Sequence, residues 1–346
     1  MIFSDFKQVL ERLASGRDFE REEARQAMEF IIRGEVNEAQ TSAFLFGMRQ
    51  KGEQADELTG FAEAMRAAMI PVQTDVSGAV DLCGTGGDHS GSFNISTAAM
   101  FVVAGAGVPV LKHGNRSISS NSGSYDVLEA LGVAPALEAP KVKTCFEQTG
   151  MAFMFAPLFH PAMKYVMPSR RALGMRTFFN IMGPLLNPAG VKRQLVGTFD
   201  EGTAHLCFNI LHRLEAERIV TVHSQDGMDE FSTAADSHVH YLPADQIPTY
   251  IIFGPEQLGL KRATHAELKG GDKEVNAEII RAILSGKATE AQTDIVLYNA
   301  AMGIFTGGLT DDFKEALELA RESVGSGKAA EKLKHFAEAT QELAHE

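Results

Sequence analysis

The first 70 residues of the chain show apolar side chains at helical spacing only. Phe6, Val9 and Leu13 lie three and four residues apart, between a capping Ser4 and a terminating Gly16, and this pattern predicts an amphipathic helix. Three more stretches of the same kind cover residues 24–32, 37–48 and 55–68. Four short amphipathic helices with brief links predict a small helical domain.

The pattern changes after residues 71–77, where a proline and polar residues mark a boundary. An apolar run at 79–82, a helical stretch at 96–106 and a second apolar run at 108–111 are typical of a parallel βαβ unit. Further strands are predicted at 153–155, 194–199 and 218–223, and further helices at 124–131, 201–214, 275–284 and in the charged stretch 310–345. The expected fold class is α/β: a small all-helical N-terminal domain plus a larger α/β domain with a mostly parallel central sheet.

Chain length also indicates two domains, since 346 residues exceed one ordinary domain of roughly 100–200 residues. We expect residues 1–72 to form the helical domain. Helices from about residue 165 to 190 are expected to join it, because the run that ends at Gly183 and Pro184 resembles a connector between domains. Residues 73–164 and 191–346 then make up the α/β domain.

Composition excludes several classes of protein. The net charge of −13 would repel nucleic acid and anionic membranes. No apolar run is long enough to span a bilayer, and the charged N-terminus is unlike a signal peptide. Cys83, Cys145 and Cys207 are widely spaced, which argues against zinc and disulfide frameworks and favours a reduced, cytoplasmic setting. A polyanionic substrate would need local basic residues or a cation.

Three glycines in four residues, Gly84, Gly86 and Gly87, follow the first predicted strand. Glycine lets the backbone approach a ligand and expose several N–H groups. The segment 92–97 then opens a helix, whose first N–H groups and hydroxyls suit a phosphate. A tight turn with an ordinary Ser/Thr helix cap would have the same sequence. No Gly-Lys-Ser/Thr follows, so the run is not a P-loop.

The second strand of the βαβ unit is followed by a basic cluster at 112–116 and then by several serines, among them Ser122. A solvated polar loop would have the same composition. Its position favours a ligand site, because ligands of open α/β sheets lie beyond the carboxyl ends of the strands, at a topological switch point.

Two further segments carry candidate chemistry. Asp229 and Glu230 follow the strand at 218–223 and suit Mg²⁺, with substrate phosphates and waters completing its shell, although a solvated acidic turn is the commoner fate of such a pair. Near residue 168, a proline can begin a short helix that presents Arg170, whose guanidinium can hold a planar carboxylate by two parallel bonds. At least one of Arg170, Arg171 and Arg176 is expected to be an ordinary surface charge with no role in binding.

Taken together, in this order and spacing, these motifs resemble the anthranilate phosphoribosyltransferase family over essentially the whole chain. The resemblance implies transfer of a phosphoribosyl group from phosphoribosyl pyrophosphate to the amine of anthranilate, in tryptophan biosynthesis, by homodimers that pair through the helical domain. It implies that phosphoribosyl pyrophosphate contacts Gly84, Gly87, Asp88, Ser92, Asn94, Ile95, Ser96, Thr97, Lys112, His113, Gly114, Asn115, Arg116, Ser117, Ile118, Ser119, Ser120 and Ser124.

Metal and acceptor sites are implied by the same resemblance. Two Mg²⁺ ions per subunit are expected, one on Ser96 and Glu230 and the second on Asp229 and Glu230. His113 is either a proton acceptor or a positioning residue. Contacts to anthranilate are implied at Gly84, Asn115 and Arg170.

Three positions depart from the commonest family pattern: His89 replaces a glycine, Ser92 a threonine and Tyr125 a small residue. They bear on loop dynamics and affinity rather than on reaction type. Two alternatives share the fold. A pyrimidine nucleoside phosphorylase would show Lys-x-Ser-Gly-Arg-Gly from residue 112 onward and would lack the acidic pair at 229 and 230. A non-catalytic nucleic-acid-binding homologue would need a basic face.

Overall fold

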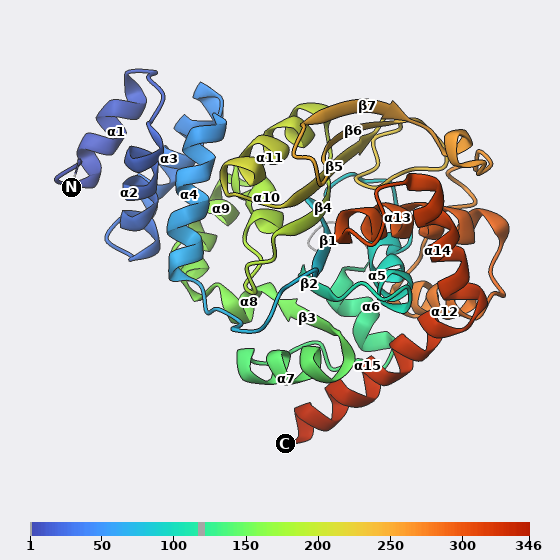
Figure 1. The fold of residues 1–346 in the computed structure, drawn as a ribbon. Helices are drawn as coiled ribbons and strands as arrows, with labels where there is room; N and C mark the ends of the chain where they lie inside the picture. Colours follow the sequence, from blue (N-terminus) through green and yellow to red (C-terminus); the bar gives the residue numbers. More distant parts are fainter. Residues whose placement is uncertain (1, 117–121) are drawn as a thin grey trace.

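The computed structural model of the protein describes residues 2–116 and 122–346. Four helices at the N-terminal end lie beside a seven-stranded sheet that carries helices on both faces (Figure 1). This arrangement confirms the fold class expected from the sequence. Within the described residues, no helix has the length and apolar character needed to cross a membrane. The four helices are α1 (Phe6–Ala14), α2 (Arg21–Ile32), α3 (Glu38–Lys51) and α4 (Ala55–Ala68).

The N-terminal helices pack around the ring of Phe44, which is fully buried. Phe6 and Phe61 lie with their ring centroids 5.7 Å from that of Phe44. The expected cap of α1 at Ser4 is wrong by one residue, because the side chain of Asp5 accepts the N–H group of Gln8 at 3.1 Å. A carboxylate at this position also complements the helix dipole.

The sheet has the strand order β3-β2-β1-β4-β5-β6-β7. The first five strands in this order pair in parallel, and β6 and β7 continue the sheet antiparallel. The chain moves outward from β1 to β3 and then returns to the other side of β1, so a topological switch point lies between β1 and β4. The strands are β1 (Val80–Gly84), β2 (Val110–Gly114), β3 (Met151–Phe155), β4 (Arg193–Gly197), β5 (Arg218–Ser224), β6 (Ser237–Leu242) and β7 (Thr249–Phe253).

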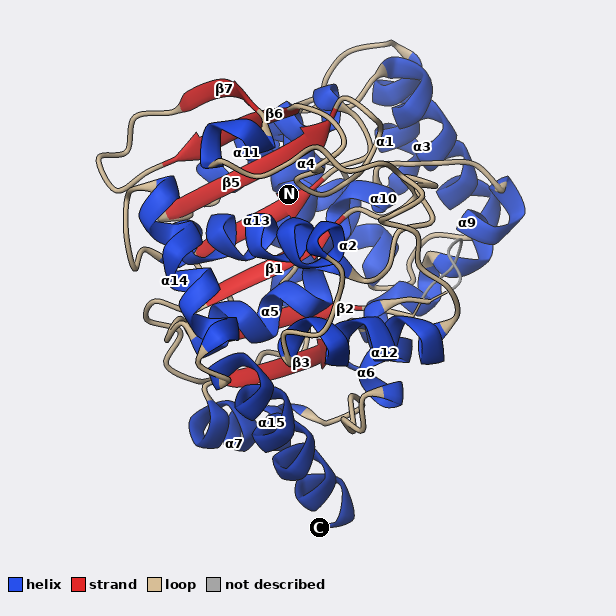
Figure 2. Cartoon of the chain, turned by 90° about the vertical axis from the view of Figure 1, so that its right-hand side faces the viewer, coloured by secondary structure: helices blue, strands red, loops and turns tan. Residues whose placement is uncertain are grey.

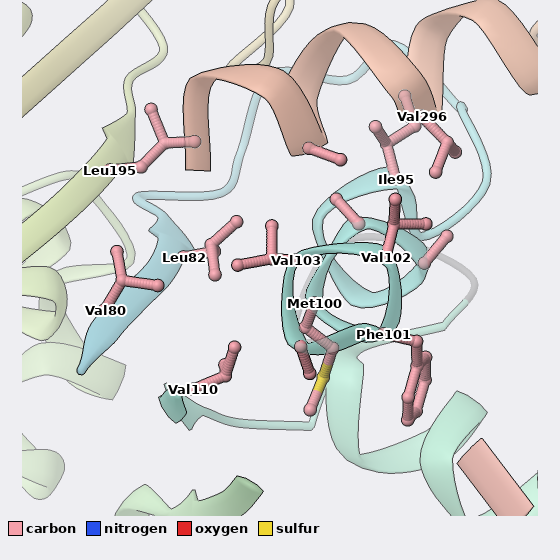
Figure 3. Packing of buried hydrophobic residues seen from close by; sticks show 14 of the residues in the cluster. Val80, Leu82, Ile95, Met100, Phe101, Val102, Val103, Val110, Leu195 and Val296 are labelled. Atoms are coloured by element: carbon pink, nitrogen blue, oxygen red, sulfur yellow. The ribbon is translucent and has the colours of Figure 1, made fainter. Parts of the chain in front are cut away.

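Helices cover both faces of the sheet, and alternate strand residues point to different cores. Val220 and Val222 of β5 belong to the core under α5 (Ile95–Gly105) and α13 (Glu290–Gly307), whereas Ile219 packs with α11 (Glu201–Arg213) and the N-terminal helices. Figure 2 shows α5, α13 and α14 across one face of the strands. Figure 3 shows Leu82 and Val103 side by side in that core, with Val296 near Ile95.

The remaining helices fill the gaps and the C-terminal end. The stretch 310–345, expected to be helical, is divided into two helices, α14 and α15. The structure places α6 (Ser124–Ala130), α7 (Ala139–Thr149), α8 (Ala156–Phe159), η1 (Pro161–Tyr165), α9 (Met167–Leu173), α10 (Phe179–Met182), η2 (Gly183–Leu185), η3 (Pro255–Leu258), α12 (Lys273–Leu284), α14 (Phe313–Gly325) and α15 (Lys328–His345).

The segment that holds α9 and α10 lies against the N-terminal helices. Phe178, between these two short helices, is buried with its ring centroid 4.8 Å from that of Phe61. Ser169 Oγ donates to the carbonyl of Glu38 at 3.1 Å, and Arg66 Nε donates to the carbonyl of Leu185 at 2.8 Å. Residues 167–185 therefore connect the sheet to the helical domain.

Candidate active site

The loop after β1 has the left-handed backbone that its glycines predict. Gly86, Gly87 and Gly91 have φ values of +67°, +77° and +68°. His89, which stands where the family pattern has glycine, also has a positive φ of 57°. A side chain at such a φ costs roughly 1 kcal/mol, so His89 introduces strain that a glycine would avoid.

Asp229 and Glu230 reach this loop from the turn after β5. Asp229 Oδ2 accepts the N–H group of Gly86 at 2.8 Å, and Glu230 Oε1 accepts that of Ser96, in the first turn of α5, at 3.2 Å. A Cβ atom on Gly84 would lie 2.6 Å from Asp229 Oδ2 and would displace this carboxylate oxygen. The tertiary structure thus brings the predicted phosphate and metal segments together.

The acidic pair is half-buried and lies beside the buried Lys112. Burial, with the neighbouring Asp88 carboxyl, raises the pKa of Asp229, and burial together with Asp229 raises the pKa of Glu230. Lys112 is 1% exposed and donates to the carbonyl of Leu82 and, at 3.3 Å, to Ser96 Oγ. Neighbouring carboxylates that repel one another at a half-buried site would be stabilised by a divalent cation.

The donor atoms around this pair fit Mg²⁺, because carboxylate and hydroxyl oxygens are its preferred ligands. Among residues 2–116 and 122–346, however, no group of three or more His, Cys, Asp or Glu side chains is arranged to hold a metal ion. Two carboxylates and one hydroxyl leave an octahedral shell incomplete, so substrate oxygens and waters would have to complete it.

His113, at the end of β2, forms a pair with His160. Their Nε2 atoms lie 3.3 Å apart, and His113 Nδ1 lies 3.2 Å from the carbonyl oxygen of Gly183. Because a carbonyl only accepts, Nδ1 of His113 carries the proton. Burial lowers the pKa of His113 to about 3 and that of His160 to about 4. A neutral, weakly basic His113 is suited to positioning rather than to accepting a proton at pH 7.

His160 and two further buried polar residues were missed by the sequence reasoning. Asn187 Nδ2 donates to Asp81 Oδ2 at 2.8 Å and to the carbonyl of Leu111 at 2.9 Å, while Asp81 Oδ1 accepts the N–H group of His113 at 3.1 Å. This network joins β1, β2 and the segment after α10. Asn187 lies in a motif that carried the family resemblance, whereas Asp81 and His160 had no local signal.

The loop after β2 is only partly described. Ser117, Ile118, Ser119 and Ser120, which the resemblance implies as substrate contacts, lie outside the described residues. Before them, the guanidinium of Arg116 lies 3.9 Å from the ring centroid of Tyr125. Tyr125 is buried with its ring centroid 4.4 Å from that of Phe155, so this departure from the family pattern is accommodated by packing. Ser124 is the first residue of α6.

The three arginines near α9 have different surroundings. Arg170 is partly buried, its guanidinium lies 5.4 Å from the ring centroid of Phe179, and burial lowers its pKa. Arg171 is exposed. Arg176 Nη2 donates to the carbonyl of Gly87 at 2.6 Å. Arg170 Nη1 donates to Met167 Sδ at 3.9 Å, and among the described residues no ion pair joins Arg170 to a carboxylate, so its guanidinium can take an anionic ligand.

A helical bundle, a mostly parallel sheet and a polar site at the switch point define a glycosyl transferase of two domains. The chain matches the helical bundle domain of the glycosyl transferase family over residues 7–69 and its a/b domain over residues 77–330. It is 47% identical to an anthranilate phosphoribosyltransferase of Salinibacter ruber, over 98% of this chain and 99% of that protein, and 48% identical to one of Moorella thermoacetica, over 94% and 96%. The chain belongs to the anthranilate phosphoribosyltransferase family.

Solved structures agree with this placement. The crystal structure of anthranilate phosphoribosyltransferase from Thermus thermophilus matches with a TM-score of 0.89 and 37% identity, covering 96% of this chain and 99% of that one. The enzyme from Saccharomyces cerevisiae in complex with PRPP and Mg matches with a TM-score of 0.88 and 25% identity, covering 97% and 98%.

Proposed function

We propose that this protein transfers the phosphoribosyl group of 5-phosphoribosyl 1-pyrophosphate to the amine of anthranilate, using Mg²⁺. The products are N-(5-phosphoribosyl)anthranilate and pyrophosphate, in tryptophan biosynthesis. The observation that carries the proposal is the meeting of Gly86, Ser96, Lys112 and the acidic pair Asp229 and Glu230 at one edge of the sheet. Relatives that match nearly the full chain are named for this activity.

The donor binds at the loops after β1 and β2. Backbone N–H groups of the glycine-rich loop and of the first turn of α5 donate to phosphate oxygens. This is supported by the two carboxylates that these N–H groups already bind, since a phosphate is the same kind of acceptor. Lys112 supplies a buried positive charge beside them.

Ser96, Asp229 and Glu230 hold Mg²⁺ together with the donor, with two ions per subunit. When bound, Mg²⁺ stabilises negative charge on the departing pyrophosphate. The protein contributes the positions of these oxygens and the N–H groups that bind the leaving group. The two half-buried carboxylates raise each other's pKa, and this repulsion supports a cation at this place.

Anthranilate is held through its carboxylate by Arg170, with Asn115 and Gly84 beside it. Its aromatic amine is neutral at pH 7, so attack on the ribose carbon needs orientation rather than a strong base. The neutral pair of His113 and His160 fits this requirement, because neither imidazole is a good proton acceptor at pH 7.

Two copies of the chain pair through the helical domain, which comprises residues 1–72 and the helices from about 165 to 190. Phe46 of α3 is 52% exposed, and a contact between copies through this helix would bury its ring. The protein works in the cytoplasm.

Loss of anthranilate fluorescence upon addition of phosphoribosyl pyrophosphate and Mg²⁺ tests this function. The chain contains no tryptophan, so the protein background is low. We expect fluorescence to fall only when donor and metal are both present, with release of one pyrophosphate per anthranilate consumed. Unchanged fluorescence, together with phosphorolysis of a pyrimidine nucleoside, would replace the proposal by the phosphorylase alternative.

A further inference from the structure

Residues 269–271, far along the chain, lie against the loop after β1. Ser92 and Lys269 form an isolated antiparallel bridge, and the N–H group of Gly270 donates to the carbonyl of Gly91 at 2.9 Å. A Cβ atom on Gly270 would lie 2.7 Å from the backbone nitrogen of Phe93, so the approach depends on glycine. This segment leads directly into α12.

Asn276, in the first turn of α12, joins this segment to Asn94. The side chain of Asn276 accepts the N–H group of Gly271 through Oδ1 at 2.8 Å and donates from Nδ2 to Asn94 Oδ1 at 2.9 Å. Asn94 Nδ2 in turn donates to the carbonyl of Ser122 at 3.0 Å. Asn276 is 2% exposed, so water does not replace these partners.

The direction of this chain of hydrogen bonds is determined at both ends. The backbone N–H group of Gly271 can only donate, so the atom of Asn276 facing it must be the oxygen. The backbone carbonyl of Ser122 can only accept, so the atom of Asn94 facing it must be the amide nitrogen. Asn94 therefore has one orientation, with its oxygen held by Asn276.

This orientation matters because Asn94 is the N-cap residue of α5. An asparagine at this position normally accepts an N–H group of the first turn with its side-chain oxygen. Here its side chain makes no capping hydrogen bond, since the oxygen is occupied by Asn276. In the first turn of α5 the N–H groups of Ile95 and Ser96 are held by the carbonyl of Phe93 and by Glu230, so the N–H group of Thr97 is the one that Asn94 leaves uncapped.

We propose that Asn276 is a positioning residue for the donor: it withholds the side-chain oxygen of Asn94 from the first turn of α5 and so leaves the N–H group of Thr97 to a phosphate oxygen. Asn276 touches no substrate and acts only through Asn94. The inference rests on the proposed function, because the anion at α5 is taken to be part of phosphoribosyl pyrophosphate.

Two variants of Asn276 test the proposal. Asn276→Asp keeps the size of the side chain and the acceptor for Gly271 but removes the donor to Asn94. Asn276→Leu removes both partners and adds no charge. We expect each variant to weaken binding of phosphoribosyl pyrophosphate with Mg²⁺, measured by calorimetry, by about tenfold, because the released oxygen of Asn94 then competes with the donor for an N–H group of α5. The KM for anthranilate should change less than about threefold.

Different outcomes separate the explanations. If Asn276→Asp weakens donor binding and Asn276→Leu does not, the added charge repels the donor, and this would overturn the proposal. Equal rises in the KM of both substrates would show a general structural role and would also overturn it. If both variants fail to fold, Asn276→Ala, which also removes the donor to Asn94, is expected to weaken donor binding in the same way, and unchanged donor binding would overturn the proposal. If the wild-type protein binds the donor but does not react with anthranilate, the proposed acceptor is wrong. The role of Asn276 in donor binding can still be tested in that case.

Discussion

Arg176 Nη2 donates a 2.6 Å hydrogen bond to the carbonyl oxygen of Gly87. Arg176 lies between α9 and α10, and Gly87 lies in the glycine-rich loop after β1, 89 positions earlier. The same guanidinium lies 4.2 Å from the ring centroid of Phe199, which follows β4. The segment that presents Arg170 is thereby tied to the loop that we assign to the donor.

We predict that Arg176→Gln loosens this loop and raises the KM for phosphoribosyl pyrophosphate. The side chain is exposed, so loss of its hydrogen bond should cost about 1 kcal/mol, or roughly fivefold in KM. Steady-state kinetics measures this change. Arg171→Gln is the matched control, because Arg171 is an exposed neighbour on α9. Identical kinetics of the two variants would show that the contact with Gly87 has no role in donor binding.

Arg170→Ala should weaken anthranilate binding. Arg170 is partly buried, so truncating one partner of a charge pair should cost about 2 kcal/mol, or roughly 30-fold in the KM for anthranilate. The KM for the donor should move much less. Arg171→Ala should leave both values near those of the wild type. An unchanged KM for anthranilate in Arg170→Ala would assign carboxylate recognition to another residue.

Mg²⁺ binding should depend on the donor. Asp229 and Glu230 already accept N–H groups of Gly86 and Ser96, and these two carboxylates cannot complete an octahedral shell. Calorimetry should therefore find weak binding of Mg²⁺ to the free protein and tighter binding once phosphoribosyl pyrophosphate is present.

The double variant Asp229→Asn with Glu230→Gln should lose this tighter Mg²⁺ binding, while Asp245→Asn, an exposed control, should retain it. Tight binding of Mg²⁺ without donor that survives in the double variant would place the metal elsewhere.

The histidine pair should make the protein less stable as the pH falls. Burial lowers the pKa of His113 to about 3 and that of His160 to about 4, from an ordinary value of 6.5. Between pH 6.5 and 4 the unfolded chain therefore binds more protons than the folded one. Each histidine then removes about 1.4 kcal/mol of stability per pH unit as the pH falls through this range.

His160→Gln should reduce that slope, because one of the two titrating groups is removed. Urea unfolding at several pH values between 7 and 4.5 measures it. His335→Gln, at an exposed position of α15, is the control and should keep the slope of the wild type. A slope in His160→Gln equal to that of the wild type would mean that His160 is protonated equally in the folded and unfolded states.

Local patterns in the sequence were sufficient to predict the helices and strands that turn one face toward the core and the other toward solvent. The amphipathic spacing of α1 to α4 follows from burial of one side, as at Val9 and Met28. The strand and helix alternation after residue 79 predicted the parallel sheet. By contrast, residues 295–307 of α13 are all buried, so this helix has no polar face and no periodic signal. Strand β6 was likewise not predicted, because polar residues such as His238 and His240 interrupt its apolar pattern.

Only part of the candidate site could be predicted from the sequence. The sequence by itself determined which segments carry glycine, basic and acidic chemistry, because these depend on residue type and on position after a strand. Only the tertiary structure decided which of the arginines contacts Gly87, that His160 pairs with His113, and that Asn276 holds Asn94. Each of these contacts joins residues at least 47 positions apart. No local pattern encodes such a contact, because it depends on how the whole chain packs.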